Sequence, residues 1–284
     1  MVWFAVARAA PDLETGDDAP PAPGASLVLL YAGEHGGELG PCGCEGWPRG
    51  GLGALATAAG VVRAEGAPTL VLNPGGWLSA EATFGELSEA AIARNLVFHR
   101  ALYEFGFDAA NVGWRELPSV ALGPHPGLVS ATHRAPELPV ARYKRFELDG
   151  LDVAVTGVSR DGLPYLRPPG TAIVDPVEAV RSLVATVDAD VWVVLAYEVE
   201  RDVPAIARLP GVDVVIDAAD HPERWPPEAV GDAVWVRSTA QGKAMGELRL
   251  WIERGAIVRA VERQVPLGPD VVPDPSVERI RLGR

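Results

Sequence analysis

The sequence predicts an α/β fold, a four-layer sandwich in which two mixed β-sheets stack face to face and are flanked by helices. In the first two thirds of the chain, short apolar segments that fit strands buried on both faces alternate with helical segments. The last segments instead alternate apolar and polar residues with period two, as antiparallel strands with one solvated face do. Parallel units followed by an antiparallel tail favour two stacked sheets with helices outside.

Length, composition and charge bound the possible functions. The 284 residues, 48% of them hydrophobic, can bury the core of one large domain, which we expect over residues 26–268. The formal net charge of -13 argues against nucleic acid as a partner, because a phosphate backbone requires a positive field. No apolar segment approaches the roughly 20 residues needed to cross a bilayer, so we expect no transmembrane segment.

The two ends of the chain differ from this domain. Residues 1–10 are apolar and end in small residues, which we interpret as the remnant of a signal peptide, with a misassigned start as the alternative. Residues 11–25 are acidic and rich in proline, and they predict a disordered linker. A signal and a linker together favour an exported protein, periplasmic or extracellular and tethered, over a cytoplasmic one. Residues 269–284 are expected to form a C-terminal tail.

The elements of the first half follow from apolar periodicity and from the positions of glycine and proline. A helix at 85–105 places Leu87, Ala91, Asn95 and Phe98 near one face. With it we expect strands at 26–31, 69–73 and 108–113, a helix at 51–66, and a proline-rich loop up to residue 138 with a short strand at 128–130.

The second half begins with a hairpin at 143–158, whose Asp-Gly turn is a strong local hairpin signal. After it we expect helices at 176–187 and 203–208, strands at 191–197 and 212–218, and antiparallel strands at 234–238, 247–253 and 256–267.

Short motifs follow these strands in a fixed order between residues 26 and 265. In chain order they are Gly-Glu-His-Gly (33–36), Gly-Gly-Leu-Gly-Ala (50–54), Leu-Asn-Pro-Gly-Gly (72–76), Gly-Phe-Asp-Ala (106–109), Gly-Trp-Arg-Glu (113–116), Leu-Ala-Tyr-Glu (195–198), Gly-Val-Asp (211–213), Ala-Ala-Asp-His (218–221), Gln-Gly-Lys (241–243) and Met-Gly-Glu-Leu (245–248).

In this order the motifs resemble the N-terminal domain of the calcineurin-like metallophosphoesterases, in the branch of the bacterial 5'-nucleotidases. That family has Asp-x-His-Gly, Gly-Gly-Leu-Ala, Leu-Asp-Ala-Gly-Asp, Gly-Tyr-Asp-Ala, Gly-Asn-His-Glu, a later histidine, Gly-Ile-Asp, Gly-His-x-His and Gly-Lys-x-x-Gly at the corresponding places. The shared order carries the resemblance, since each motif alone is weak, and an unrelated α/β protein with chance matches is the alternative. The resemblance implies the sandwich fold and, for the family, metal-dependent hydrolysis of phosphoric esters.

Most metal ligands that the resemblance implies are replaced in this chain. A two-metal site needs carboxylates and imidazoles around cations about 3.5–4 Å apart. The corresponding positions hold Gly33, Gly76, Trp114, Tyr197 and Ala219, and only His35 and His221 match. Arg115 stands where the histidine that assists the leaving group is expected. We therefore expect no dinuclear Mn, Fe or Zn site, and His35, Arg115 and His221 are the catalytic candidates if the chain is active.

Acidic residues close to these positions are possible substitutes. Glu34, Glu116, Glu198, Asp217 and Asp220 all lie within one or two residues of an expected ligand. A shift by one residue in a strand turns the side chain to the other face, so such a ligand would have to lie in the loop beyond the strand. We favour the alternative that these acids are solvated loop residues.

The only two cysteines, Cys42 and Cys44, lie in the loop after the first strand, at the edge where α/β sheets bind ligands. This Pro-Cys-Gly-Cys loop resembles a divergent subgroup of exported bacterial proteins in the same superfamily. Three interpretations stay open. The thiolates with His35 and His221 hold a single Zn or Cu ion; or the pair forms a reducible disulfide suited to thiol exchange; or the cysteines only staple the loop or are ordinary thiols.

Three tryptophans, Trp47, Trp77 and Trp114, follow strand ends on the same side. They either fill the volume left by lost metals or form a docking patch for another protein. Taken together, we expect a divergent, catalytically inactive metallophosphoesterase-like domain that acts as an exported binding or assembly subunit. The alternatives are a phosphoester hydrolase with substituted ligands and a Cys/His single-metal or thiol-redox protein.

Overall fold

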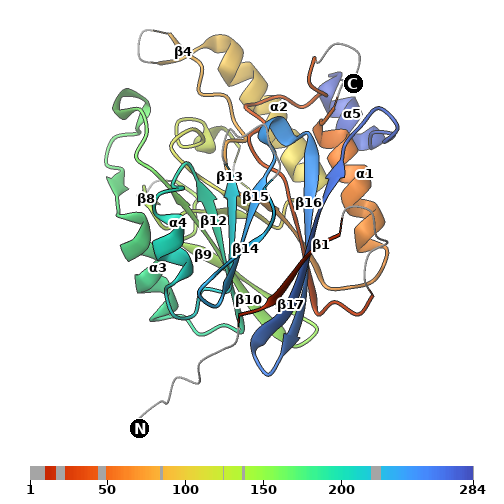
Figure 1. The fold of residues 1–284 in the computed structure, drawn as a ribbon. Coiled ribbons are helices and arrows are strands. Elements are labelled where there is room, and N and C mark those ends of the chain that lie inside the picture. Colours follow the sequence, from red (N-terminus) through yellow and green to blue (C-terminus); the bar gives the residue numbers. More distant parts are fainter. Residues whose placement is uncertain are drawn as a thin grey trace.

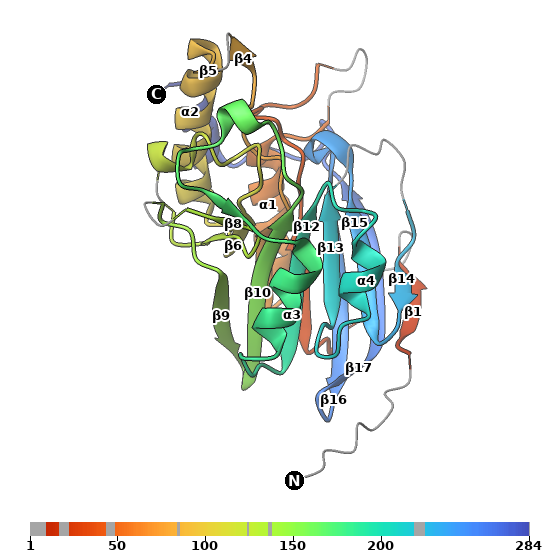
Figure 2. The same cartoon turned by 90° about the vertical axis from the view of Figure 1, so that its left-hand side faces the viewer.

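Two large β-sheets lie face to face at the centre of the molecule, and helices cover their outer faces (Figure 1; Figure 2). The computed structural model describes residues 10–16, 23–43, 49–83, 86–123, 125–135, 138–218 and 225–283. Both sheets contain parallel and antiparallel pairs, so the expected sandwich of two mixed sheets is confirmed.

The first sheet has seven strands. Their spatial order is β1 (Asp12–Thr15), β17 (Ala256–Pro266), β16 (Ala244–Glu253), β2 (Leu27–Tyr31), β3 (Thr69–Asn73), β6 (Ala109–Asn111) and β7 (Leu128–Val129). The helices α1 (Leu52–Arg63), α2 (Glu89–Phe105) and α5 (Pro275–Arg281) belong to this half of the molecule.

The second sheet has six strands. Their order is β14 (Glu228–Val230), β15 (Ala233–Ser238), β13 (Val214–Ala218), β12 (Val191–Tyr197), β10 (Leu151–Ser159) and β9 (Tyr143–Leu148). The helices α3 (Pro176–Val184) and α4 (Val203–Ala207) cover its outer face, on the side opposite α1 in Figure 1. Two small antiparallel pairs complete the described fold, β4 (Ala82–Thr83) with β5 (Glu86–Leu87), and β8 (His133–Arg134) with β11 (Ala172–Ile173).

Three apolar clusters hold these layers together. In β12 all seven residues are buried, with Val193 and Leu195 facing the first sheet and Trp192 and Val194 facing the helices. A strand buried on both faces has no solvated side, which explains why its sequence is continuously apolar. The third cluster joins the outer face of the first sheet to α1, α2 and α5.

Capping residues set the two ends of α2. The helix begins at Glu89 and not at residue 85, because the Ser88 hydroxyl accepts a hydrogen bond from the Ala91 amide at 3.1 Å. Gly106, with φ of 73°, ends the helix in the left-handed conformation that favours glycine. Ala91, Asn95 and Phe98 are buried on the expected face of α2.

Regular structure occurs in the described segments that flank the domain. Asp12–Thr15, within the stretch predicted to be a disordered linker, forms β1 and pairs in parallel with β17, where Glu14 makes a two-bond ion pair with Arg259. The stretch predicted to be a tail contains α5, which buries Val277 and contacts α1 and α2. Backbone pairing to a distant strand and a helix cap at Asp274 stabilise these segments. The expectation of a disordered linker is therefore wrong for Asp12–Thr15, whereas the C-terminal tail stays a prediction. Among the described helices, none has the length and apolar character to span a membrane.

Candidate functional site

The carboxyl ends of the parallel strands of both sheets meet on one side of the molecule. A methyl group built on Gly33, after β2, would lie 3.1 Å from the Ala218 side chain at the end of β13. One built on Gly113, after β6, would lie 2.7 Å from the Ser159 hydroxyl at the end of β10. We call the residues that end or follow β2, β3, β6, β10, β12 and β13 the strand-end face. Open α/β sheets bind ligands at such edges.

The Tyr197 ring fills the centre of the strand-end face. Methyl groups built on Gly75, Gly76 and Gly113 would lie 2.6, 3.0 and 2.9 Å from atoms of Tyr197, closer than real side chains pack. The Tyr197 hydroxyl is buried without a hydrogen-bond partner. Burial, followed by the nearby Glu34 and Glu116, raises the pKa of this phenol, so Tyr197 is neutral at physiological pH. The tyrosine and the glycines therefore act as one packed unit.

Glu34 lies beside this unit. Its carboxylate oxygen Oε1 would be 2.7 Å from a methyl group on Gly76, whose φ of 70° also favours glycine. Glu34 itself is a non-glycine residue in the left-handed region, with φ of 57°, and so is Glu198, with φ of 52°. Left-handed backbone at such residues costs roughly 1–3 kcal/mol each and is found most often at functional sites.

Glu116 connects two loops of the first sheet. Its side chain is fully buried and accepts hydrogen bonds from the amides of Leu78 and Gly113, at 3.3 and 3.1 Å. Burial raises the pKa of Glu116 to about 7. The two backbone donors fix the carboxyl group in place, and this argues for a structural role.

Asp217 is also fully buried, and neither of its carboxylate oxygens has a hydrogen-bond partner. Burial and then Glu200 raise the pKa of Asp217 to about 7. Its neighbours in β13 face the first sheet, so Asp217 points to the outer, helix-covered side and away from the Tyr197 unit. The expectation of solvated loop acids is wrong for Glu34, Glu116 and Asp217, because loops or packed strands cover all three; Asp220 lies outside the described residues.

Arg115 is half-buried over the Trp114 ring, with its guanidinium carbon 5.4 Å from the ring centre. Burial opposes its charge, but Tyr197, Glu34, Glu116 and Glu198 outweigh this and raise the pKa of Arg115. The Nε atom of Arg115 is buried without a hydrogen-bond partner.

Trp114 contacts an ion pair formed by Glu198 and Arg160. Its indole nitrogen donates a hydrogen bond to Glu198 at 3.1 Å, and Glu198 also pairs with Arg160. The Arg160 guanidinium lies 5.2 Å from the Trp114 ring centre. Arg160 was not predicted as a site residue, although its place directly after β10 at the strand-end face is a signal that could have found it.

Trp77 does not belong to any docking surface. Its side chain is fully buried, donates a hydrogen bond to the Asn111 carbonyl at 2.8 Å and packs on Phe98 and His99. The expectation that it helps to dock a partner is therefore wrong, because it is a core residue that fills volume behind the strand ends. Trp114 is half-exposed, and Trp47 lies outside the described residues.

His35 is placed as a core residue of the strand-end face. It is 4% exposed, its ring packs edge-on against Phe98, and a methyl group on Gly242 would lie 2.6 Å from its Nε2. Burial lowers the pKa of His35 to about 4, so its ring is neutral at physiological pH. Its Nδ1 atom has no hydrogen-bond partner.

Cys42 is disulfide-bonded, and its amide and sulfur both contact the Arg49 backbone. Cys44 and His221, the other residues predicted to hold a metal with Cys42 and His35, lie outside the described residues. Within the described part of the chain, no three His, Cys, Asp or Glu side chains form a group that could hold a metal. A disulfide sulfur is not the thiolate that Zn or Cu requires, so the single-ion site stays a prediction for the reduced chain.

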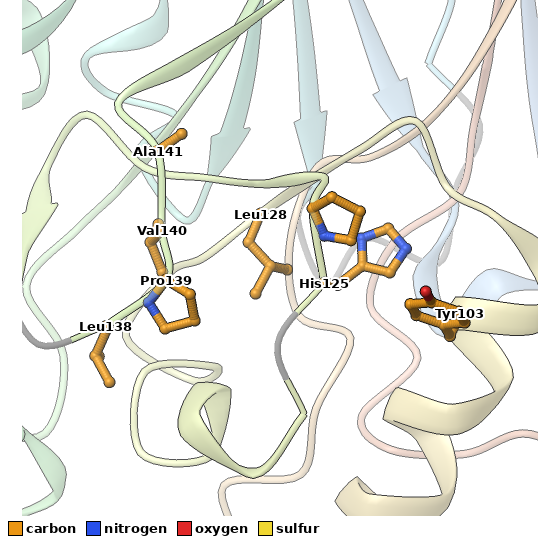
Figure 3. Close-up of a pocket in the computed structure, with 8 residues that line it drawn as sticks. Tyr103, His125, Leu128, Leu138, Pro139, Val140 and Ala141 are labelled. Atoms are coloured by element: carbon orange, nitrogen blue, oxygen red, sulfur yellow. The ribbon is translucent and has the colours of Figure 1, made fainter.

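A cavity of about 670 Å³ lies beside β7. Figure 3 shows Tyr103 and His125 next to each other at one end of this cavity and the segment 138–141 at the other. His125 accepts a hydrogen bond from the Gly127 amide at 3.0 Å. None of the residues predicted for the site lines this cavity.

The fold and this face define the class of structures that the chain resembles. No family model matches the sequence, and no curated protein matches it. Among solved structures, sulfate thiohydrolase SoxB from Thermus thermophilus, in complex with glycerol, matches with a TM-score of 0.75 and 19% identity, covering 94% of this chain and 61% of that one. A 5'-nucleotidase precursor, also from Thermus thermophilus, matches with a TM-score of 0.71 and 21% identity, covering 90% of this chain and 58% of that one. The calcineurin-like phosphoesterase YfkN from Bacillus subtilis matches with a TM-score of 0.69 and 16% identity, covering 90% of this chain and 96% of that one.

The chain therefore has the calcineurin-like phosphoesterase fold, which confirms the resemblance inferred from the order of the motifs. Because these structures share at most 21% sequence identity with the chain, the similarity shows the fold and not the activity. The chain spans about 60% of the length of SoxB and of the 5'-nucleotidase precursor. The likeness of the Pro-Cys-Gly-Cys loop to a subgroup stays a prediction.

Proposed function

We propose that the chain is a divergent metallophosphoesterase-like domain that does not hydrolyse phosphoric esters and serves as an exported binding or assembly subunit. The packing of Tyr197 against Gly75, Gly76 and Gly113 carries this proposal. The aromatic ring takes up the space into which ligands after β3 and β6 would project. A carboxylate at position 76 would meet both Tyr197 and Glu34.

The donor set of the described residues does not fit two divalent cations. Hard cations bind carboxylate, imidazole and water ligands. At the family's ligand positions the described residues are Gly33, His35, Gly76, Trp114 and Tyr197. Only the single imidazole of His35 and the neutral, buried phenol of Tyr197 supply a donor atom, too few for two cations. We therefore derive no hydrolytic step for this face.

A binding role is supported by the residues that remain accessible there. Trp114, Arg115 and Arg160 form one stacked group at the surface, and tryptophan and arginine are the residue types most enriched at interface hot spots. The strained backbone of Glu34 and Glu198 flanks the same group. Backbone strain of this kind clusters at functional sites, which supports a function for the face.

Export is supported by the cysteine and by the start of the chain. Disulfides form and persist in oxidising compartments such as the periplasm, and Cys42 is disulfide-bonded. The apolar residues 1–10 fit an export signal. One solved structure of the same fold is described as that of a precursor.

Elemental analysis combined with an aryl phosphate assay tests the proposal. The purified chain, incubated with Mn(II), Fe(II) or Zn(II) and desalted, should retain no pair of ions and should not hydrolyse an aryl phosphate above the buffer rate. The variant Glu14→Ala, on β1, is the matched control for preparation effects. Two retained ions per chain, together with turnover that His35→Ala abolishes, would overturn the proposal.

A second candidate function rests on the oxidised state of Cys42. A disulfide in a short Cys-x-Cys loop can exchange with external thiols if its reduction potential lies near that of the compartment. Equilibration in glutathione buffers of stepped potential, followed by alkylation and mass measurement, gives that potential. A value below about −300 mV would indicate a structural staple and exclude thiol exchange.

A further inference from the structure

Arg115 presents an unused hydrogen-bonding group at the strand-end face. Two other arginines of this face, Arg160 and Arg167, are paired with Glu198 and Asp161. Arg115 makes no hydrogen bond or ion pair with the described residues, although it is half-buried. A guanidinium group carries five donors in a planar fork, and arginines in such positions are normally satisfied.

The Arg115 guanidinium group is enclosed at its Nε atom and accessible at its terminal nitrogens. Its Nε atom is enclosed, and the group stacks over Trp114, which Glu198 holds by a hydrogen bond. The terminal nitrogens are not among the enclosed atoms. A methyl group built on Gly36 would meet only the Arg115 Nη1 atom, at 4.0 Å. The Gly36 turn therefore flanks the fork at Nη1, and it brings no side chain of its own.

The charges around Arg115 select among anions. Glu34 and Glu198 lie near enough to raise its pKa, so a ligand with two negative charges would be repelled more strongly than one with a single charge. A planar carboxylate matches the fork of an arginine with two parallel hydrogen bonds. A divalent cation, in contrast, would be opposed by the charge of Arg115 itself.

We propose that Arg115 binds a carboxylate group at the strand-end face, held between the Gly36 turn and the Trp114 ring. The inference rests on the proposed binding function, because it concerns the same face and names the chemistry of its ligand. The carboxylate belongs either to a small organic acid or to an acidic side chain of a partner, and both sources use the same fork.

A chemical-shift titration of the full chain tests this proposal. The resonances to follow are the indole N–H of Trp114 and the Nε–H of Arg115. One arm adds sodium acetate and the other adds the blocked tripeptide Gly-Glu-Gly, each at ionic strength matched with sodium chloride. Saturable shifts of both resonances are expected. Tighter binding of the tripeptide than of the matched Gly-Gln-Gly peptide and of acetate identifies an acidic side chain as the source, whereas equal binding of acetate and tripeptide identifies a small acid.

Two variants and one competing anion make the test decisive. Arg115→Met should weaken binding at least about tenfold, because it removes both hydrogen bonds, and Arg115→Lys should recover only part of the loss. Arg145→Met is the charge-matched control on β9, where Arg145 lies opposite Ala154 of β10 and pairs with Asp152, and it should bind as the wild type does. Thermal unfolding confirms that each variant is folded.

The proposal is overturned by shifts that chloride alone reproduces, by unchanged binding in Arg115→Met, or by tighter binding of inorganic phosphate than of acetate. These outcomes are independent of the metal and phosphatase assays. A chain that binds no metal but also no carboxylate would refute this inference and leave the proposed loss of hydrolysis standing.

Discussion

Gly75 and Tyr197 are packed so closely that a methyl group on Gly75 would lie 2.6 Å from both Cβ and Cγ of Tyr197. The contact joins the turn after β3 in the first sheet to the end of β12 in the second. It therefore locks the two sheets together at the edge where a phosphoesterase fold would open its active site. The φ of Gly75, 140°, adds a backbone reason for glycine at this position.

Gly75→Ala should lower the free energy of unfolding by about 2–4 kcal/mol, because the new methyl group forces the ring or the turn to move. Gly60→Ala is the matched control, since Gly60 lies in α1 with open space around its Cα. That control should raise the free energy of unfolding by about 0.5–1 kcal/mol. Urea unfolding measures both. Equal effects of the two substitutions would show that the Tyr197 contact is not tight.

Tyr197→Phe should raise the free energy of unfolding by about 1 kcal/mol, because it removes a buried hydroxyl that has no partner. Tyr31 is an equally buried tyrosine whose hydroxyl donates a hydrogen bond to Glu262 at 3.0 Å. Tyr31→Phe should therefore lower the free energy of unfolding by about 1–3 kcal/mol. Opposite signs in one denaturation series are the expected result. A destabilised Tyr197→Phe would reveal a partner for this hydroxyl in solution.

Asp217 should make the protein less stable as pH rises from about 4 to about 7. Its pKa is about 7 in the folded state and near 3.8 when unfolded, so the folded state holds the proton more tightly and loses this advantage as pH rises through 7. The loss is about 4 kcal/mol at most, and Glu116 adds a loss of the same sign. Asp217→Asn should flatten the pH dependence of urea unfolding, whereas the exposed control Asp188→Asn should leave it unchanged. An unaltered slope in Asp217→Asn would contradict burial of the charge.

Glu247→Ala should lower the free energy of unfolding by about 2–3 kcal/mol. Glu247 is 1% exposed on β16 and accepts hydrogen bonds from Arg249 at 2.5 Å and Arg263 at 2.6 Å. Its removal leaves Arg263 without this partner and leaves the buried Arg249 with Glu65 alone. Glu14→Ala breaks the exposed pair with Arg259 and should have an effect within the error of the measurement. Calorimetry on the two variants provides the comparison, and similar melting temperatures would refute the distinction.

The fold was predictable where the signal is local. The strands at 69–73 and 191–197 were predicted with their final bounds, because continuously apolar segments between breakers leave little choice. β1 escaped prediction since its pairing depends on β17, more than 240 residues later, and three of its four residues are polar. The cap of α5 was readable, because Asp274 precedes Pro275 and its carboxylate accepts the Ser276 and Val277 amides.

The candidate site was predictable in position and not in packing. The order of the motifs brought Gly33, Gly76, Trp114 and Tyr197 to one face, where the structure also places them. That the Tyr197 ring contacts three glycine turns depends on the approach of two sheets, which no local pattern encodes. The burial of Asp217 was missed for the same reason, since the sequence shows an acid near a strand end but not what covers it.

The pairing of β2 constrains how the chain can reach this state. β2 has β3 on one side, made about 40 residues later, and β16 on the other, more than 200 residues later. At about 5–20 residues per second, a ribosome leaves the second edge of β2 open for about 10–40 s. During that interval Leu27–Tyr31 presents an apolar template for other chains, so productive biogenesis depends on shielding the nascent N-terminal half until β16 emerges.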